Sequence, residues 1–91
     1  MARVCVHLKA EGLVHGVYFR KTMASVASAE GVTGWVRNMA DGSVEALIEG
    51  EESAVSRVVD WARRGPPRAR VDSLTVKRRL PRSLKGFRIA G

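Results

Sequence analysis

The sequence has 91 residues, of which 45% are hydrophobic, and a formal net charge of +7. This length and composition suit one folded domain over residues 1–91 and argue against disorder. No run approaches the roughly 18 apolar residues of a membrane span, and a single cysteine, Cys5, excludes an internal disulfide. We therefore expect a cytoplasmic protein that does not associate with a membrane.

The positive charge is concentrated in the last third of the chain. Ten of the sixteen Lys and Arg residues lie within residues 63–88, where Asp72 is the only acidic residue. Such an excess attracts anionic partners in general. It leaves open whether the partner is a small phosphate compound or a nucleic acid, and whether the region is simply a solvated surface.

Hydrophobic periodicity predicts strands and helices in the order β-α-β-β-α-β, followed by a short final strand. Val4, Val6 and Leu8 alternate with polar residues, which indicates a first strand that is half-buried on one face. The later elements are expected to be a helix at 20–30, strands at 32–38 and 44–49, a helix at 51–64, a strand at 71–77, a loop at 78–85 and a short strand at 86–89.

This order is the split βαβ arrangement of ferredoxin-like α+β domains. Right-handed crossovers place both helices on one face of a four- to five-stranded antiparallel sheet, which makes a sandwich of two layers. The first strand lies beside the third, and the third pairs with the second through a hairpin turn at residues 39–42. The first and second strands then run parallel, so the loop after the first and Asn38 at the end of the second share one sheet edge.

Residues 12–20, with the sequence GLVHGVYFR, predict an anion-binding loop. Gly12 and Gly16 permit backbone conformations in which successive N–H groups point at one centre. The start of the following helix adds unpaired amides and the positive end of its dipole. Arg20 supplies a planar fork that fits two oxygens of a phosphate or carboxylate. The loop therefore suits a phosphate-like group.

Asn38 makes this loop a candidate hydrolytic site. Its side chain donates and accepts hydrogen bonds, so it can hold a water in line with phosphorus while the loop fixes the phosphoryl oxygens. The local residues leave open the alternative that the glycines only shape a turn and that Arg20 is a surface residue. A phosphocysteine mechanism is disfavoured because Cys5 lies in a strand away from Arg20. His7 and His15 without clustered carboxylates make no convincing metal site.

Two spaced motifs resemble those of the acylphosphatase family. The first, G-x-V-Q-G-V-x-F-R, corresponds to residues 12–20, and the second, G-W-V-x-N followed by D-G-S/T-V, to residues 34–38 and 41–44. The Gly-Pro-Pro segment at 65–67 and the closing G-F-x-I at 86–89 are also similar to the family pattern. The resemblance covers almost the whole chain and favours the phosphate site over a simple turn.

The resemblance implies a ferredoxin-like enzyme that hydrolyses the carboxyl–phosphate bond of acyl phosphates without metal or cofactor. It implies that Asn38 orients the attacking water and that the substrate's own phosphate takes the proton. The partner is then a small-molecule acyl phosphate, and we expect the protein to be a monomer. The phosphate would be held by the side chain of Arg20 and the backbone of the loop residues His15, Gly16, Val17, Tyr18, Phe19 and Arg20.

His15 departs from the family pattern, which usually has glutamine at this place. The backbone of the loop should tolerate the change because it depends on Gly16 and main-chain N–H groups. An imidazole near a phosphate adds positive charge when it is protonated. We therefore expect an additional acidic limb in the pH profile of the activity.

Two other functions compete with this interpretation. A non-catalytic domain of the same kind would bind a phosphorylated metabolite or serve a larger assembly, but the presence of both Arg20 and Asn38 argues against it. RNA-recognition domains share the βαββαβ order. They stack bases on sheet aromatics, and the third expected strand has none between residues 43 and 49. We expect no specific nucleic-acid partner.

Overall fold

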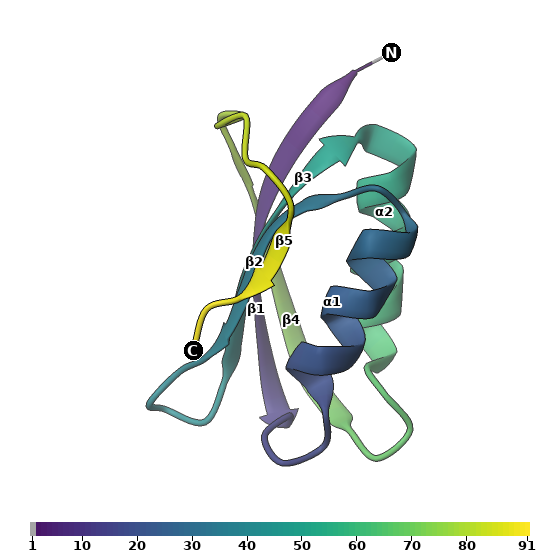
Figure 1. The fold of residues 1–91 in the computed structure, drawn as a ribbon. Coiled ribbons are helices and arrows are strands. Elements are labelled where there is room, and N and C mark those ends of the chain that lie inside the picture. Colours follow the sequence, from purple (N-terminus) through teal and green to yellow (C-terminus); the bar gives the residue numbers. More distant parts are fainter. Residues whose placement is uncertain (1) are drawn as a thin grey trace.

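Two helices cover one face of a five-stranded sheet in the computed structural model, which describes residues 2–91 (Figure 1). The order of elements confirms the predicted ferredoxin-like α+β fold. The elements are β1 Arg3–Leu13, α1 Phe19–Ala29, β2 Thr33–Asn38, β3 Val44–Glu51, α2 Glu52–Arg64, β4 Arg70–Arg79 and β5 Phe87–Ile89. Neither helix of the described chain is long and apolar enough to cross a membrane.

The strands lie side by side in the order β4-β1-β3-β2-β5. β3 pairs antiparallel with both β1 and β2. β1 and β2 therefore run in the same direction, as expected. Their C-terminal ends lie at the same end of the sheet. The loop before α1 and the end of β2 are brought together there (Figure 1).

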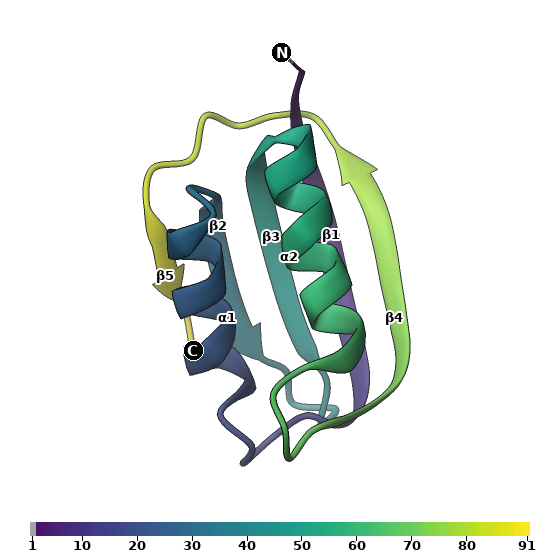
Figure 2. The same ribbon diagram turned by 90° about the vertical axis from the view of Figure 1, so that its right-hand side faces the viewer.

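The sheet departs from the expected antiparallel pattern at one edge, because β5 pairs parallel with β2. β4 runs antiparallel to β1 and so ends where β1 and β2 begin. The connection from β4 crosses that end of the sheet (Figure 2). β5 therefore starts beside the start of β2 and runs in the same direction.

β1 and β4 are both longer than expected. Arg78 and Arg79, which we expected in a loop, pair with Val6 and Cys5 of β1. Pairing at the other end continues to Leu13 across a register shift between Glu11 and Gly12. A Cβ on Gly12 would lie 2.2 Å from the carbonyl oxygen of Arg70, so only glycine fits this irregularity.

The core lies between the helices and one face of the sheet. Alternate residues of β1 and β3 point into it, which confirms the predicted period of two. The helices contribute residues three and four positions apart. The core residues from these elements include Val4, Val6, Leu8 and Ala10 of β1, Val44, Ala46 and Ile48 of β3, Phe19, Met23 and Ala27 of α1, and Ala54, Val55, Val58 and Ala62 of α2.

Candidate active site

The loop between β1 and α1, residues 14–18, presents backbone amides at the start of a helix. Gly16 and Tyr18 both adopt left-handed conformations, with φ of 71° and 63°. The first hydrogen bond of α1 runs from the amide of Thr22 to the carbonyl of Tyr18 over 3.0 Å. The amides of the first helical turn precede it and have no acceptor within the helix. This end of α1 is therefore favourable for an anion.

Tyr18 holds a backbone conformation that glycine usually occupies. A left-handed residue with a Cβ costs about 1–2 kcal/mol, and strain of this kind clusters at binding loops. The side chain is 72% exposed, so packing of the ring does not account for the conformation. The course of the loop toward α1 imposes it.

A pocket of about 440 Å³ opens beside this loop. Arg20, in the first turn of α1, and Asn38, the last residue of β2, both line it, so the expected juxtaposition is present. Its other lining residues carry no carboxylate, and Lys21 adds a second positive charge. The full lining consists of Val14, Gly16, Tyr18, Phe19, Arg20, Lys21, Asn38 and Ile89.

The residues after β5 hold the guanidinium of Arg20 from one side. An Nη1 group of Arg20 donates to the carbonyl oxygen of Gly91, which also accepts from the amide of Asn38 over 3.3 Å. A guanidinium has five N–H donors, so the others stay available to an anion in the pocket. The end of β5 therefore lines the pocket through Ile89, and Gly91 beyond it orients the arginine of the site.

The side chain of Asn38 has an unsatisfied acceptor. Its Oδ1 atom is buried and has no hydrogen-bond partner within residues 2–91. A buried polar atom without a partner costs about 1–3 kcal/mol and calls for an explanation such as a bound water. Oδ1 of Asn38 is thus placed to accept a hydrogen bond from a small donor that enters the pocket.

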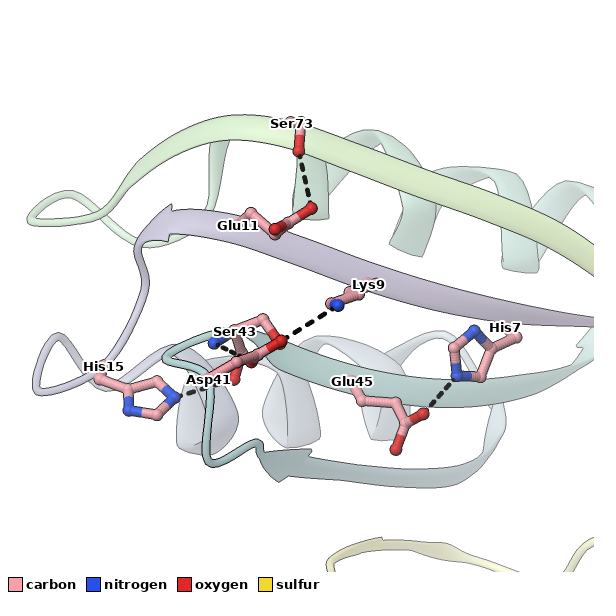
Figure 3. Close-up of polar contacts among 8 residues, drawn as sticks. All are labelled: His7, Lys9, Glu11, His15, Asp41, Ser43, Glu45 and Ser73. Atoms are coloured by element: carbon pink, nitrogen blue, oxygen red, sulfur yellow. Dashed lines mark hydrogen bonds and ion pairs between the residues drawn. The ribbon is translucent and has the colours of Figure 1, made fainter.

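His15 does not line the pocket; its ring points toward Ser43 and joins the loop to the β2–β3 turn (Figure 3). Its Nε2 lies 2.8 Å from the carbonyl oxygen of Ser43. The same oxygen accepts from the amide of Met39 over 2.8 Å, the residue that follows Asn38. Because a carbonyl can only accept, Nε2 must carry the proton. His15 therefore ties the loop to the turn next to Asn38.

The turn itself is held by Asp41. Its Oδ1 accepts from the amide and the hydroxyl of Ser43 at 2.9 and 2.6 Å, and its Oδ2 lies 3.1 Å from Nζ of Lys9 (Figure 3). The hydroxyl and amide of Ser43, together with Lys9, hold the pKa of the Asp41 carboxyl far below its usual value. The Asp41 carboxylate therefore stays ionised at neutral and mildly acidic pH and keeps accepting these bonds.

The structure brings most of the expected phosphate-binding residues to the pocket. Gly16, Tyr18, Phe19 and Arg20 line it together with Asn38, whereas His15 and Val17 do not.

Three further residues of the site were not foreseen. Lys21 follows Arg20 and could have been suspected from its charge alone. Ile89 and Gly91 come from the far end of the chain. Only the unexpected direction of β5 brings them here, so no local signal could have indicated them.

The remaining cysteine and histidine lie elsewhere, as expected. Burial and the neighbouring carboxylate of Glu49 raise the pKa of the Cys5 thiol, which keeps it protonated. Nε2 of His7 lies 2.7 Å from the carboxylate of Glu45 on the open face of the sheet (Figure 3). Within residues 2–91, no three His, Cys, Asp or Glu side chains gather closely enough to hold a metal ion.

Comparison with known proteins shows the family of this chain. The family described as Acylphosphatase matches residues 6–89. The chain belongs to the acylphosphatase family. Among its relatives, the acylphosphatase of Thermococcus kodakarensis is 48% identical over 91 residues, which is the full length of both chains.

Solved structures of acylphosphatases share the fold. The enzyme from Coxiella burnetii superposes with a TM-score of 0.93 at 31% identity, and covers 97% of this chain and 93% of its own. The enzyme from Bacillus subtilis has the same TM-score at 30% identity, and covers 97% and 99%. The chain is thus an acylphosphatase hydrolase, and acyl phosphates are its small-molecule substrates.

Proposed function

We propose that the pocket beside the β1–α1 loop is where the enzyme hydrolyses the carboxyl–phosphate bond. One observation carries this assignment: Arg20 and Asn38 line the same pocket of about 440 Å³, and the buried Oδ1 of Asn38 has no partner within residues 2–91. One residue supplies donors for an anion and the other an acceptor for a water. A hydrolytic phosphate site needs both groups in one place.

In this proposal the phosphoryl group lies against the loop amides and the guanidinium of Arg20. The donors stabilise the negative charge on the equatorial oxygens, which is most of what phosphoryl transfer requires. Of the loop residues, Gly16, Tyr18, Phe19 and Arg20 line the pocket and contribute through their backbone, whereas His15 and Val17 complete the loop that presents them. Lys21 adds positive charge at the rim.

The attacking water donates a hydrogen bond to Oδ1 of Asn38 and directs a lone pair at phosphorus. As the new P–O bond forms, the bond between phosphorus and the acyl oxygen breaks, and the carboxylate leaves with the bonding electrons. The proton of the water passes to a phosphoryl oxygen, which yields a carboxylate and dihydrogen phosphate. A carboxylate is a good leaving group, so a dedicated acid is unnecessary, and we propose that no metal or cofactor takes part.

Phosphate release from acetyl phosphate in the presence of a chelator tests the two roles. Arg20→Ala and Asn38→Ala should each lower kcat/KM by roughly a hundredfold to a thousandfold, the usual effect of removing one stabilising group. Arg37→Ala is the matched control, because Arg37 neighbours Asn38 in β2 but its side chain pairs with Glu45 over 2.7 Å. Full activity of either site variant, or loss of activity with chelator, would refute the proposal.

We further propose that residues 1–91 act as a single domain and as a monomer in the cytoplasm. The shared core of both helices and the sheet supports the first point. For the second point, Arg20 and Asn38 of the same chain already line one pocket, so the proposed chemistry needs no residue from a second copy. The lone cysteine, buried and unpaired, suits a reducing compartment.

A further inference from the structure

A second hollow lies directly beside the proposed phosphate pocket. It has a volume of about 490 Å³ and separates α1 from the connection between α2 and β4. We call it the proline groove, because Pro66 and Pro67 form one of its walls. The opposite wall comes from the loop and from α1, through Val17, Thr22 and Ser25. In Figures 1 and 2 these two connections lie next to each other at one end of the molecule.

The walls of the groove are held rigidly relative to each other. The ring of Phe19, at the start of α1, packs against Trp61 of α2 with 5.2 Å between ring centroids. Gly65 follows α2 with φ of 71°, and a Cβ there would come within 2.9 Å of the Phe19 ring. The amide of Ala69 then donates to the carbonyl of Pro66 over 2.9 Å. The proline turn is therefore fixed close to the first turn of α1.

The groove adjoins the phosphate pocket at Tyr18 and Lys21, which line both. Asn38 lines only the pocket, and the two prolines line only the groove. In phosphoryl transfer the attacking and leaving oxygens lie roughly in line on opposite sides of phosphorus. If the water is held at Asn38, the acyl oxygen leaves on the far side, toward the residues that the two hollows share.

We propose that the proline groove is the acyl subsite, and that it takes the apolar acyl groups of extended acyl phosphates. This inference rests on the proposed function of the neighbouring pocket. The ring of Tyr18, 72% exposed, Val17 and the two prolines offer apolar contact to an aliphatic chain or an aromatic ring. Lys21 and Arg68 stand at the groove and disfavour acyl groups that carry a positive charge.

Hexanoyl and acetyl phosphate are suitable probes, because their carboxylate leaving groups differ little in basicity. A difference in kcat/KM between them therefore reports contact with the chain and not leaving-group reactivity. Each buried CH₂ group contributes about fourfold. With two or more of the additional carbons in contact, the wild type should prefer hexanoyl phosphate by at least about tenfold.

Ser25→Asp is the informative variant, and Ser28→Asp is its control. Both serines are exposed on α1, but only Ser25 lines the groove. Both variants add the same charge to the same helix, so general repulsion of the substrate affects acetyl and hexanoyl phosphate alike. Ser25→Asp should abolish the preference for hexanoyl phosphate, because a chain in the groove would have to desolvate the new carboxylate. Ser28→Asp should keep the preference.

The outcomes distinguish a failure of the acyl subsite from a failure of the proposed hydrolysis in the neighbouring pocket. Turnover of acetyl phosphate with no preference for hexanoyl phosphate in the wild type overturns the acyl subsite alone. Equal changes of the preference in both serine variants also overturn it. No turnover of acetyl phosphate by the wild type overturns the proposed function, and the subsite with it.

Discussion

Asn38 combines an unpaired side-chain acceptor with a place in the lining of the pocket. A buried acceptor without a donor normally destabilises a protein, yet this one belongs to a residue that lines the same pocket as Arg20. Both residues are anchored by the carbonyl of Gly91, through the amide of one and the side chain of the other. These two bonds hold both residues of the proposed site in place relative to the end of β5.

His15 carries a prediction at this same scale. Its Nε2–H donates to the carbonyl of Ser43, a bond that the neutral Nε2–H tautomer and the protonated ring make equally well. A protonated ring therefore adds positive charge near the loop without releasing the turn. We predict an acidic limb in the profile of kcat/KM against pH, and its loss in His15→Gln.

Comparing His15→Leu with His15→Gln separates the effect of the hydrogen bond to Ser43 from the effect of the imidazole charge. His15→Leu loses the donor as well, so it should lower the free energy of unfolding by about 0.5–1.5 kcal/mol relative to His15→Gln, as measured by urea denaturation. An acidic limb that persists unchanged in His15→Gln would sink the assignment of that limb to His15.

Among the secondary-structure elements, the connection between β4 and β5 depends on one buried carboxylate. Glu49 of β3 accepts from the amides of Arg82, Ser83 and Leu84 at 3.0, 3.0 and 3.3 Å and from Nε of Arg3 at 2.8 Å. These bonds hold the connection where it crosses the sheet toward β5. Because β5 leads to Ile89 and Gly91, Glu49 supports a wall of the pocket from a distance.

Protonation of Glu49 should lower the free energy of unfolding at acidic pH. Burial alone would raise the pKa of its carboxyl, but the three amides and Arg3 outweigh burial and lower it. A carboxyl whose pKa is lower in the folded state stabilises the fold above its unfolded pKa. It loses that contribution as the pH falls through the folded value.

Glu49→Gln tests this point. A neutral amide accepts fewer of these bonds, so the variant should lose about 1–3 kcal/mol of unfolding free energy at neutral pH, and the difference from wild type should shrink on acidification. Glu11→Gln, a change of an exposed glutamate in β1, is the control. A difference that stays constant from neutral pH to well below the ordinary carboxyl pKa would contradict the role of its charge.

The elements also show how far the sequence could be followed. The hydrophobic periods predicted each helix and strand, and both helices end within one residue of their predicted ends, because these signals are local. Glu49 alternates onto the open face of the sheet, where a glutamate is expected to be solvated, and nothing nearby reveals that three amides cover it. The direction of β5 depends on the course of the connection between β4 and β5, which the local sequence does not reveal. The place of Ile89 at the pocket depends on it as well. The partner of His15 lies 28 residues away and is equally non-local.

For the molecule as a whole, the net charge of +7 acts on a negatively charged substrate. No carboxylate lines the pocket, and the positive potential of the surface raises the local concentration of anions. Added salt screens charges that lie beyond about 10 Å at 0.1 M. We predict that KM for acetyl phosphate rises with chloride concentration while kcat stays nearly constant.

The distant charges can be tested directly. Lys77→Gln combined with Arg79→Gln removes two exposed charges of β4, at the edge of the sheet opposite β5. The double variant should show a weaker dependence of KM on salt than wild type, with kcat retained. A KM that does not change between low and high chloride would show that the overall charge has no part in substrate capture.

Binding of inorganic phosphate to Asn38→Ala, measured by isothermal titration calorimetry, tests the central division of roles most directly. If Arg20 and the loop hold the phosphoryl group and Asn38 holds only the water, Asn38→Ala should bind phosphate about as tightly as wild type while its turnover of acetyl phosphate is lost. Arg20→Ala should lose both. Phosphate binding that disappears in Asn38→Ala, or turnover that survives in it, would contradict the account.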